Sequence, residues 1–298
     1  MQALVECVPN FSEGRRPEVL NAITAALRGH AARGVRLLDI ESDTDHNRSV
    51  FTLVAPPKAM VAAVFDAIKT AAGLIDLEQH RGAHPRIGAT DVVPFVPLRG
   101  MEMADCVELA RELGQRVGEE LQIPVYLYEA AATRPDRVNL ADIRHGEYEG
   151  LKAEIGANPS RRPDFGPARL GPAGATVVGA RTFLIAYNVF LTTSDIEIAK
   201  RIAKTVRHSS GGLRHVKALG LLVNGKAQVS MNLTDFHKTP IHVAVEMIRR
   251  EAQRYGVAIE SSEIVGLLPQ QALLDAAAWY LQLANFRPEM VLENRMEG

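Results

Sequence analysis

The most reactive part of the sequence is a twenty-residue stretch from Asp76 to Phe95, which reads DLEQHRGAHPRIGATDVVPF. It combines two histidines, two arginines and three carboxylates with two glycines and two prolines. His84 lies near its centre; Gly82 and Gly88 tolerate backbone angles closed to other residues, and the proline after His84 blocks continuation of a helix. Such a stiff loop can hold an imidazole, whose pKa lies near neutral pH, in one orientation. We therefore predict that His84 is a general acid and base in a proton-transfer reaction.

Two other interpretations of this histidine are open. His80 and His84 are four residues apart, a spacing that could bind a metal ion if the segment were helical. Gly82 and Pro85 argue against a helix, and the glutamate of an HExxH motif is missing, so we expect no metal site. The second alternative is a purely structural histidine in a surface loop.

The composition is that of a globular protein and argues against several classes of function. The chain has 298 residues, enough for two domains, with 47% hydrophobic and 23% charged residues. Its net charge of −1 gives no bulk attraction to nucleic acid or to an anionic membrane. Cys7 and Cys106 lie in apolar segments, as is typical of a reducing compartment. Because no signal peptide and no membrane-spanning apolar run is recognisable, we expect a cytoplasmic protein without nucleic-acid or membrane partners.

The elements that would position His84 follow from hydrophobic periodicity. Apolar residues recur with a helical period over 61–75, just before the histidine loop, and again over 103–121. Residues 91–96, between the loop and the second of these helices, are typical of a buried strand. A helix beginning near Pro17 is also predicted. The remaining strands expected in the first half are residues 4–8, 35–40, 49–54 and 124–128.

Residues 129–178 have a different character. They are polar, with a short helical patch, up to residue 151, and residues 158–174 are dense in proline and glycine. That composition is typical of a linker or a binding loop. Phe165, Arg169 and Leu170 lie among the glycines, and a flexible spacer has no need of such side chains.

The rest of the chain repeats the order of the first half. The dipeptide Asn224-Gly225, between two apolar runs, predicts a tight hairpin. Each half reads strand-helix-strand-strand-helix-strand, with an extra helix and strand in the first. We therefore predict an α+β fold of two ferredoxin-like (split βαβ) subdomains, with mixed sheets and outer helices, and a ligand cleft between them. The expected subdomains are residues 1–178 and 179–298.

Several longer motifs resemble a known family. They are LVECVPNFSEG at 4–14, RGAHPRIGA at 81–89, RPDFGP at 162–167, GATVVGARTFLIAYN at 174–188, QVSMNLTDF at 228–236, VGLLP at 265–269 and ALLDA at 272–276. Together they resemble the formiminotransferase family of glutamate formimidoyltransferases, in order from Leu4 to about Tyr280. The sequence looks like a stand-alone transferase, without the cyclodeaminase portion of the bifunctional animal enzyme.

The resemblance implies transfer of a formimidoyl group from N-formimidoyl-L-glutamate to N5 of tetrahydrofolate, with release of glutamate, as in histidine degradation. It places the family's catalytic histidine on His84 and an assisting aspartate on Glu41, whose side chain is one methylene longer. It also implies a homodimer, with tetrahydrofolate as co-substrate. The family's folate-contacting loop, one residue shorter here, falls on Gly166, Pro167, Ala168, Arg169, Leu170, Gly171, Pro172, Ala173 and Gly174.

The chemistry of this transfer suits one histidine. The attacking N5 must lose a proton and the departing glutamate nitrogen must gain one, so a single imidazole can serve both steps. A carboxylate such as Glu41 would orient the ring and stabilise imidazolium. Neither a covalent enzyme intermediate nor a metal ion is required.

Polar side chains near loop and strand ends are candidates for binding the substrates. Both substrates carry glutamate carboxylates, which guanidinium forks bind well. Arg48 and Arg86 are the first candidates, together with Arg181 and Arg214, and surface ion pairs are the alternative for each. The side-chain amide of Asn10 could hydrogen-bond to a ligand.

The sequence leaves two other functions open. One is a folate enzyme resembling 5-formyltetrahydrofolate cyclo-ligase, which would need ATP, although the sequence has no Walker-type phosphate loop. The other is a non-catalytic module of two ferredoxin-like domains that binds a small effector.

Overall fold

The computed structural model describes residues 2–296 and divides the chain into two compact units. Unit 1 ends at Arg181 and unit 2 begins at Thr182. The expected boundary after residue 178 falls inside strand β7 (Thr176–Ala180), which is hydrogen-bonded on both sides within unit 1. The coarse prediction of a mixed α and β protein with two sheets is confirmed.

Unit 1 is built on a seven-stranded mixed sheet. Along the sheet, β3 pairs with β4, the short strands β1 and β2 both lie between β4 and β5, and β7 and β6 follow. The pairs β5–β7 and β7–β6 are parallel, and all the others are antiparallel. Besides β7, the strands are β1 (Val5–Cys7), β2 (Asn10–Phe11), β3 (Arg36–Asp43), β4 (Arg48–Ala55), β5 (Thr90–Pro97) and β6 (Val125–Glu129).

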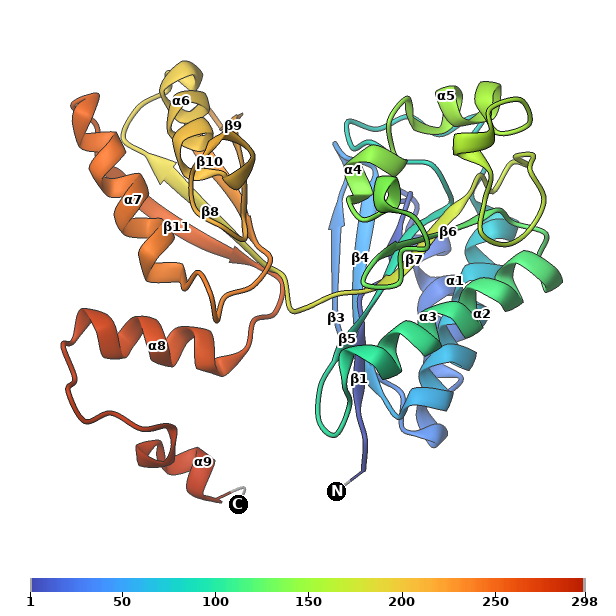
Figure 1. Ribbon diagram of the computed structural model, residues 1–298, viewed down its shortest axis with the longest axis horizontal. Coiled ribbons are helices and arrows are strands. Elements are labelled where there is room, and N and C mark those ends of the chain that lie inside the picture. The colour runs from blue at the N-terminus through green and yellow to red at the C-terminus, as the bar shows by residue number, and fades with distance from the viewer. Residues whose placement is uncertain (1, 297–298) are drawn as a thin grey trace. The chain divides into compact units, whose positions relative to one another are not determined.

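Three amphipathic helices cover one face of this sheet: α1 (Pro17–Arg28), α2 (Pro57–Leu74) and α3 (Met103–Glu120) (Figure 1). Prolines at the start of α1 and α2 favour the first helical turn. The apolar stripe of each helix packs on the sheet in one continuous core. In that core the rings of Phe11 and Phe51 meet edge to face at 5.2 Å. The helical period read over residues 61–75 and 103–121 is therefore confirmed.

The stretch between β6 and β7, in which a short helical patch was expected before residue 151, forms several short helical segments. They are η2 (Pro135–Arg137), α4 (Leu140–Ile143), α5 (Glu147–Glu154) and η3 (Pro159–Arg161). Their few apolar side chains, such as Ile143 and Leu151, pack with Tyr126 and Tyr128 of β6 in a separate small core. This segment is thus a packed part of unit 1.

Unit 2 has a four-stranded antiparallel sheet in the order β11-β8-β10-β9. The Asn224-Gly225 turn joins β9 to β10 with both residues at positive φ, so the predicted hairpin is confirmed. Helices α6 and α7 bury their apolar faces in the core of this unit. Its elements are β8 (Ile185–Leu191), α6 (Ile196–Val206), η4 (His208–Ser210), β9 (Val216–Val223), β10 (Lys226–Leu233), α7 (Ile241–Arg254), β11 (Ile259–Val265), α8 (Gln270–Tyr280), η5 (Pro288–Met290) and α9 (Leu292–Met296). Within residues 2–296, none of the helices has the length and apolarity of a transmembrane segment.

Strand β1 carries a buried carboxyl group away from the helical core. Glu6 is 5% exposed and lies opposite Val54 of β4 and Val96 of β5. Burial raises the pKa of Glu6 from 4.5 to about 7, against an opposing effect of the Arg181 guanidinium. The folded state therefore favours the protonated form of this side chain.

This predicts a measurable pH dependence of stability. Because the folded-state pKa is raised, the contribution of Glu6 is fully present below pH 4.5 and is lost as the pH rises through about 7. Relative to Glu6→Gln, the wild-type chain should lose about 3 kcal/mol of unfolding free energy over that range. Urea unfolding of both proteins at pH 4.5 and pH 8 measures the difference. Parallel pH profiles for the two proteins would contradict the raised pKa.

Candidate active site

The loop that carries His84 is braced by the turn between β3 and β4. The Ala83 amide donates to the Asp45 carbonyl (3.1 Å), and the Asn47 side-chain amide donates to the Arg81 carbonyl (3.0 Å). A Cβ on Gly82 would lie 2.2 Å from the His46 carbonyl oxygen, so only glycine fits there. The segment is a non-helical loop, as expected, and its glycine allows close approach of another backbone. His84 itself is half-buried.

Cationic groups dominate the surroundings of the His84 ring. Burial lowers its pKa from 6.5 to about 2, and the charges of Arg48, Arg144 and His46 act in the same direction. A hydrogen bond to the Pro85 carbonyl has the opposite effect. The ring centroids of His46 and His84 are 6.2 Å apart. At neutral pH His84 is therefore an uncharged imidazole, which can accept a proton.

The guanidinium of Arg48 rests on a neutral amide. Its Nε and Nη2 both donate to Oδ1 of Asn10, the first at 3.0 Å. The Asn10 amide is oriented in turn, because its Nδ2 donates to the Val8 carbonyl at 2.8 Å. The structure thus brings Arg48 and Asn10 together beside His84, with Asn10 positioning the arginine. Burial and Arg144 lower the pKa of Arg48 to about 10, whereas Asp91, Asp43 and Glu41 act to raise it.

A second arginine reaches the site from the polar segment between β6 and β7. Arg144, at the C-terminal end of α4, forms an ion pair with Asp91 of β5. The other oxygen of Asp91 accepts the Ile87 amide at 2.8 Å, so one buried carboxylate connects this arginine to the backbone of the His84 loop. Sequence reasoning missed both residues. A carboxylate inside the apolar run that follows the histidine loop was the signal that could have found Asp91.

Glu41 lies on β3 opposite Val50 of β4. Its carboxylate acts on the charge of Arg48, whereas the strongest charge effects on His84 come from cations. A direct role of Glu41 on the His84 ring therefore stays a prediction.

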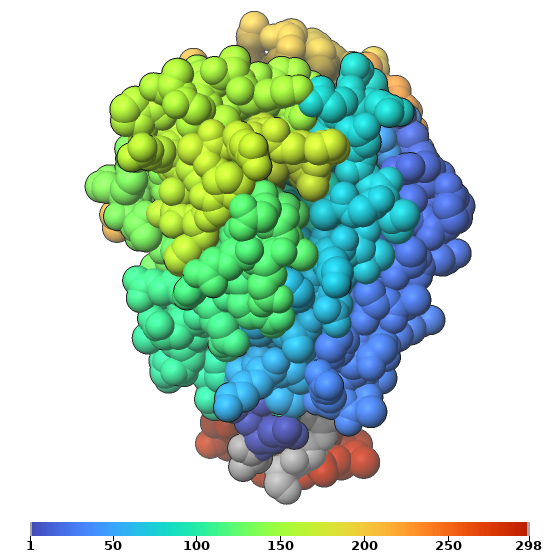
Figure 2. All heavy atoms as spheres, turned by 90° about the vertical axis from the view of Figure 1, so that its right-hand side faces the viewer, coloured from blue at the N-terminus to red at the C-terminus, as the bar shows by residue number. Residues whose placement is uncertain are grey.

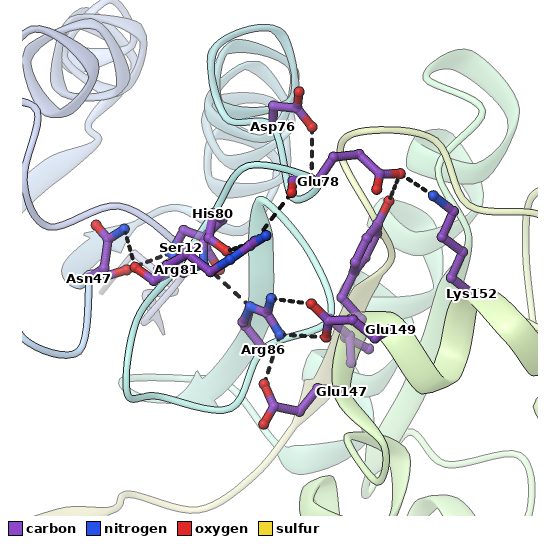
Figure 3. A network of polar contacts seen from close by, with 12 residues as sticks. Ser12, Asn47, Asp76, Glu78, His80, Arg81, Arg86, Glu147, Glu149 and Lys152 are labelled. Atoms are coloured by element: carbon purple, nitrogen blue, oxygen red, sulfur yellow. Dashed lines mark hydrogen bonds and ion pairs between the residues drawn. The ribbon is translucent and has the colours of Figure 1, made fainter.

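Arg86 is engaged in a different network, shown in Figure 3. Its guanidinium pairs with Glu147 at 2.8 Å and Glu149 at 2.7 Å, and its Nε donates to Nδ1 of His80 at 3.3 Å. His80 in turn contacts the Asn47 carbonyl through Nε2 at 3.0 Å. The Arg86 guanidinium is thus occupied by carboxylates of the protein and connects the His84 loop to α5, and its binding of a substrate carboxylate stays a prediction. Among residues 2–296, no group of three or more His, Cys, Asp or Glu is arranged to hold a metal ion.

The proline- and glycine-rich segment 166–174 is ordered against both ends of the His84 loop. The Pro172 carbonyl accepts the Leu77 amide and the Ala173 carbonyl accepts the Ala89 amide, each at 2.8 Å. Gly174 adopts φ +69° where a Cβ would lie 2.2 Å from the Ile87 carbonyl oxygen. In Figure 2 the segment lies at the surface of unit 1, on the face that α3 helps to form.

The start of this segment is fixed by packing on α3. A Cβ added at Gly114 would lie 3.2 Å from the Phe165 ring, and one added at Gly118 would lie 2.8 Å from the Phe165 Cβ. The Phe165 carbonyl accepts the Val125 amide at 2.9 Å. Phe165 is therefore a packing residue, and the segment that follows it is held at both ends. Within it Pro167 is half-buried, Ala168 and Arg169 are exposed, and Leu170 packs against the core.

Comparison with known proteins decides the family. The formiminotransferase domain, N-terminal subdomain, matches residues 4–181, and the formiminotransferase domain matches residues 186–295. The chain belongs to the formiminotransferase family. It is 54% identical to the glutamate formimidoyltransferase of Thermoplasma acidophilum, over 99% of this chain and 98% of that protein. It is 44% identical to the Streptococcus pyogenes protein of the same name, over the full length of both. With the formimidoyltransferase-cyclodeaminase of Rattus norvegicus it shares 46% identity over 94% of this chain, which spans 53% of that longer protein.

In this formiminotransferase, the Arg86 network predicts a stability effect. Arg86→Gln would remove the guanidinium that holds two glutamates and the buried His80, at a cost of about 2 kcal/mol of unfolding free energy. The matched control is Arg111→Gln, which breaks the exposed pair with Glu108 on α3 and should cost less than about 0.5 kcal/mol. Urea unfolding of the two variants and the wild type measures both. Equal losses would contradict a structural role specific to Arg86.

Proposed function

We propose that this protein is a glutamate formimidoyltransferase, a transferase of one-carbon groups. It moves the formimidoyl group of N-formimidoyl-L-glutamate to N5 of tetrahydrofolate and releases L-glutamate. The observation that carries the proposal is the full-length likeness to two proteins of that name. The site is compatible with it, since an uncharged imidazole lies beside arginines suited to carboxylate substrates. Tetrahydrofolate would be a co-substrate, and the reaction needs no metal ion.

In the proposed mechanism His84 carries the proton between two nitrogens. N5 of the folate attacks the formimidoyl carbon to give a tetrahedral centre, and the ring nitrogen of His84 takes the proton that N5 loses. The same ring then gives this proton to the glutamate nitrogen, so that the C–N bond breaks and a neutral amine departs. N5 gains a C–N bond and loses a proton, the glutamate nitrogen loses its C–N bond and gains that proton, and the enzyme forms no covalent bond to the substrate.

We also propose roles for residues 166–174 and for Glu41. Residues 166–174 would bind the folate; their hydrogen bonds to Leu77 and Ala89 support this, because they hold the segment next to the His84 loop. Glu41 would assist catalysis by acting on Arg48, whose charge acts in turn on His84.

We also propose a ferredoxin-like arrangement of the strands in both units. In unit 2 the element order β8-α6-β9-β10-α7-β11 and the sheet order β11-β8-β10-β9 support a ferredoxin-like subdomain. In unit 1, β5-β1-β4-β3 gives the same order, to which β7 and β6 are added. A cytoplasmic homodimer completes the proposal. Exposed apolar side chains in unit 2, such as Leu219 and Leu222, support self-association.

Replacement of His84 tests the mechanism. His84→Gln should lower the rate of 5-formimidoyltetrahydrofolate formation by about 10²–10⁴-fold, because the proton carrier is lost. Equilibrium binding of tetrahydrofolate should stay close to wild type. His208→Gln, at an exposed histidine in η4, is the matched control and should leave the rate unchanged.

The same assay distinguishes the transferase from the other candidate functions. A wild-type chain that converts 5-formyltetrahydrofolate with ATP, and leaves N-formimidoyl-L-glutamate unreacted, would replace the transferase with a cyclo-ligase. An undiminished transfer rate in His84→Gln would remove the proposed role of the histidine.

A further inference from the structure

The charges that act most strongly on the His84 ring are those of cationic groups, Arg48 and Arg144 among them. Arg144 is paired with Asp91, whereas both donors that Arg48 directs into the protein end on the neutral oxygen of Asn10. Nε of Arg144 is buried and has no hydrogen-bond partner among residues 2–296. Two guanidinium groups thus face one buried carboxylate next to an uncharged imidazole.

This arrangement is unfavourable until an anion joins it. Burial is the largest cause of the lowered pKa values of Arg48 and His84, and the charge of Arg144 acts in the same direction on both groups. Guanidinium groups bind planar carboxylates with two parallel hydrogen bonds. An incoming carboxylate would therefore supply both the missing charge and acceptors for the unused donors.

We propose that Arg48 and Arg144 together bind the α-carboxylate of the formimidoylated amino acid, and that this bound anion enables His84 to hold a proton. The inference rests on the proposed function and adds the carboxylate that the site selects. The α-carboxylate carbon is two bonds from the nitrogen that leaves, so a carboxylate site beside the proton-carrying ring fits it. The carboxylates of folate are separated from N5 by the aminobenzoyl group and fit this position poorly.

The proposed coupling is electrostatic. Charged and titratable groups surround His84 from several elements: Arg48 from β4, Arg144 after α4 and His46 from the turn between β3 and β4. The carboxylates of Asp91, Asp43 and Glu41 act on Arg48 from β5 and β3. A substrate carboxylate between the arginines would offset the two cations that disfavour imidazolium. Binding of the α-carboxylate would then also stabilise the protonated ring and thereby lower the barrier to proton transfer.

The first test follows the protonation of the ring directly. The full-length protein with 13C-labelled histidine is titrated by NMR, and the His84 signal is assigned as the one missing from His84→Gln. Saturating L-glutamate should raise the pKa of His84 by more than one unit relative to the free protein. The matched probe is 4-aminobutanoate, which has the same chain without the α-carboxylate and should leave the pKa unchanged. An equal response to both compounds, or none to glutamate, would overturn the proposal.

The second test uses kinetics. Wild type should prefer N-formimidoyl-L-glutamate over N-formimidoyl-4-aminobutanoate by roughly 10²-fold or more in kcat/KM, and Arg144→Met should lose most of this preference. Arg48→Lys keeps the positive charge but cannot form the two parallel hydrogen bonds of a guanidinium group. It should therefore raise KM for the glutamate substrate while His84 keeps its low pKa.

Tetrahydropteroate, which lacks the glutamate tail of folate, tests whether the arginines bind the folate carboxylates instead. If Arg144→Met slows turnover of tetrahydrofolate but not of tetrahydropteroate, the arginines bind the folate tail and the proposal fails.

These tests distinguish failure of the proposed carboxylate site from failure of the transferase assignment. Glutamate-dependent titration of His84 is measured without turnover, so it can support or overturn the carboxylate site in either case. A chain that shows this titration but forms no 5-formimidoyltetrahydrofolate would refute the transferase assignment alone.

Discussion

The site depends on the buried carboxylate of Asp91. One of its oxygens accepts the Ile87 amide at the end of the His84 loop, and the other pairs with Arg144 from the segment between β6 and β7. A buried charge is stable only when it is paired and hydrogen-bonded, so the two contacts are mutually required. Asp91 stands at the beginning of β5, a strand buried along nearly its whole length. The sheet thereby fixes in space a loop and an arginine that are sixty residues apart in the chain (84 and 144).

The same reasoning shows which parts of the site could be read from the sequence. Glycines and proline around His84 predicted a stiff, non-helical loop, because their backbone restrictions are local properties. The glycines serve close approach to the turn between β3 and β4 and to β7, and no local pattern announces such tertiary neighbours. Arg86 was favoured for its adjacency to His84, yet its side chain extends toward α5. Arg144, sixty positions away, lies in the site. Sequence distance is a poor guide to which guanidinium faces an active-site ring.

Regular elements were more predictable than the segments that connect them. The helices α2 and α3 follow from a strong apolar period, since each must bury one face on the sheet. Strand β7 was not predicted, because it directly follows the proline- and glycine-rich segment and the expected subdomain boundary after residue 178 falls inside it. Short helices α4 and α5 carry few apolar residues, and their positions depend on contacts such as Arg86 with Glu149. Such contacts are long-range and leave little trace in composition.

The charge pattern around His84 resolves an apparent conflict in the chemistry. A ring whose pKa is lowered to about 2 is a stable neutral base but a poor holder of a proton. In the proposed mechanism, the ring must hold that proton briefly between the two nitrogens. Burial is the largest cause of the lowered pKa of His84, and the charges of Arg48 and Arg144 add to it. A negatively charged substrate beside these arginines would offset their part of the effect. Because charges at close range interact strongly where water is partly excluded, one substrate carboxylate beside Arg48 and Arg144 would raise the basicity of the ring in the proposed complex.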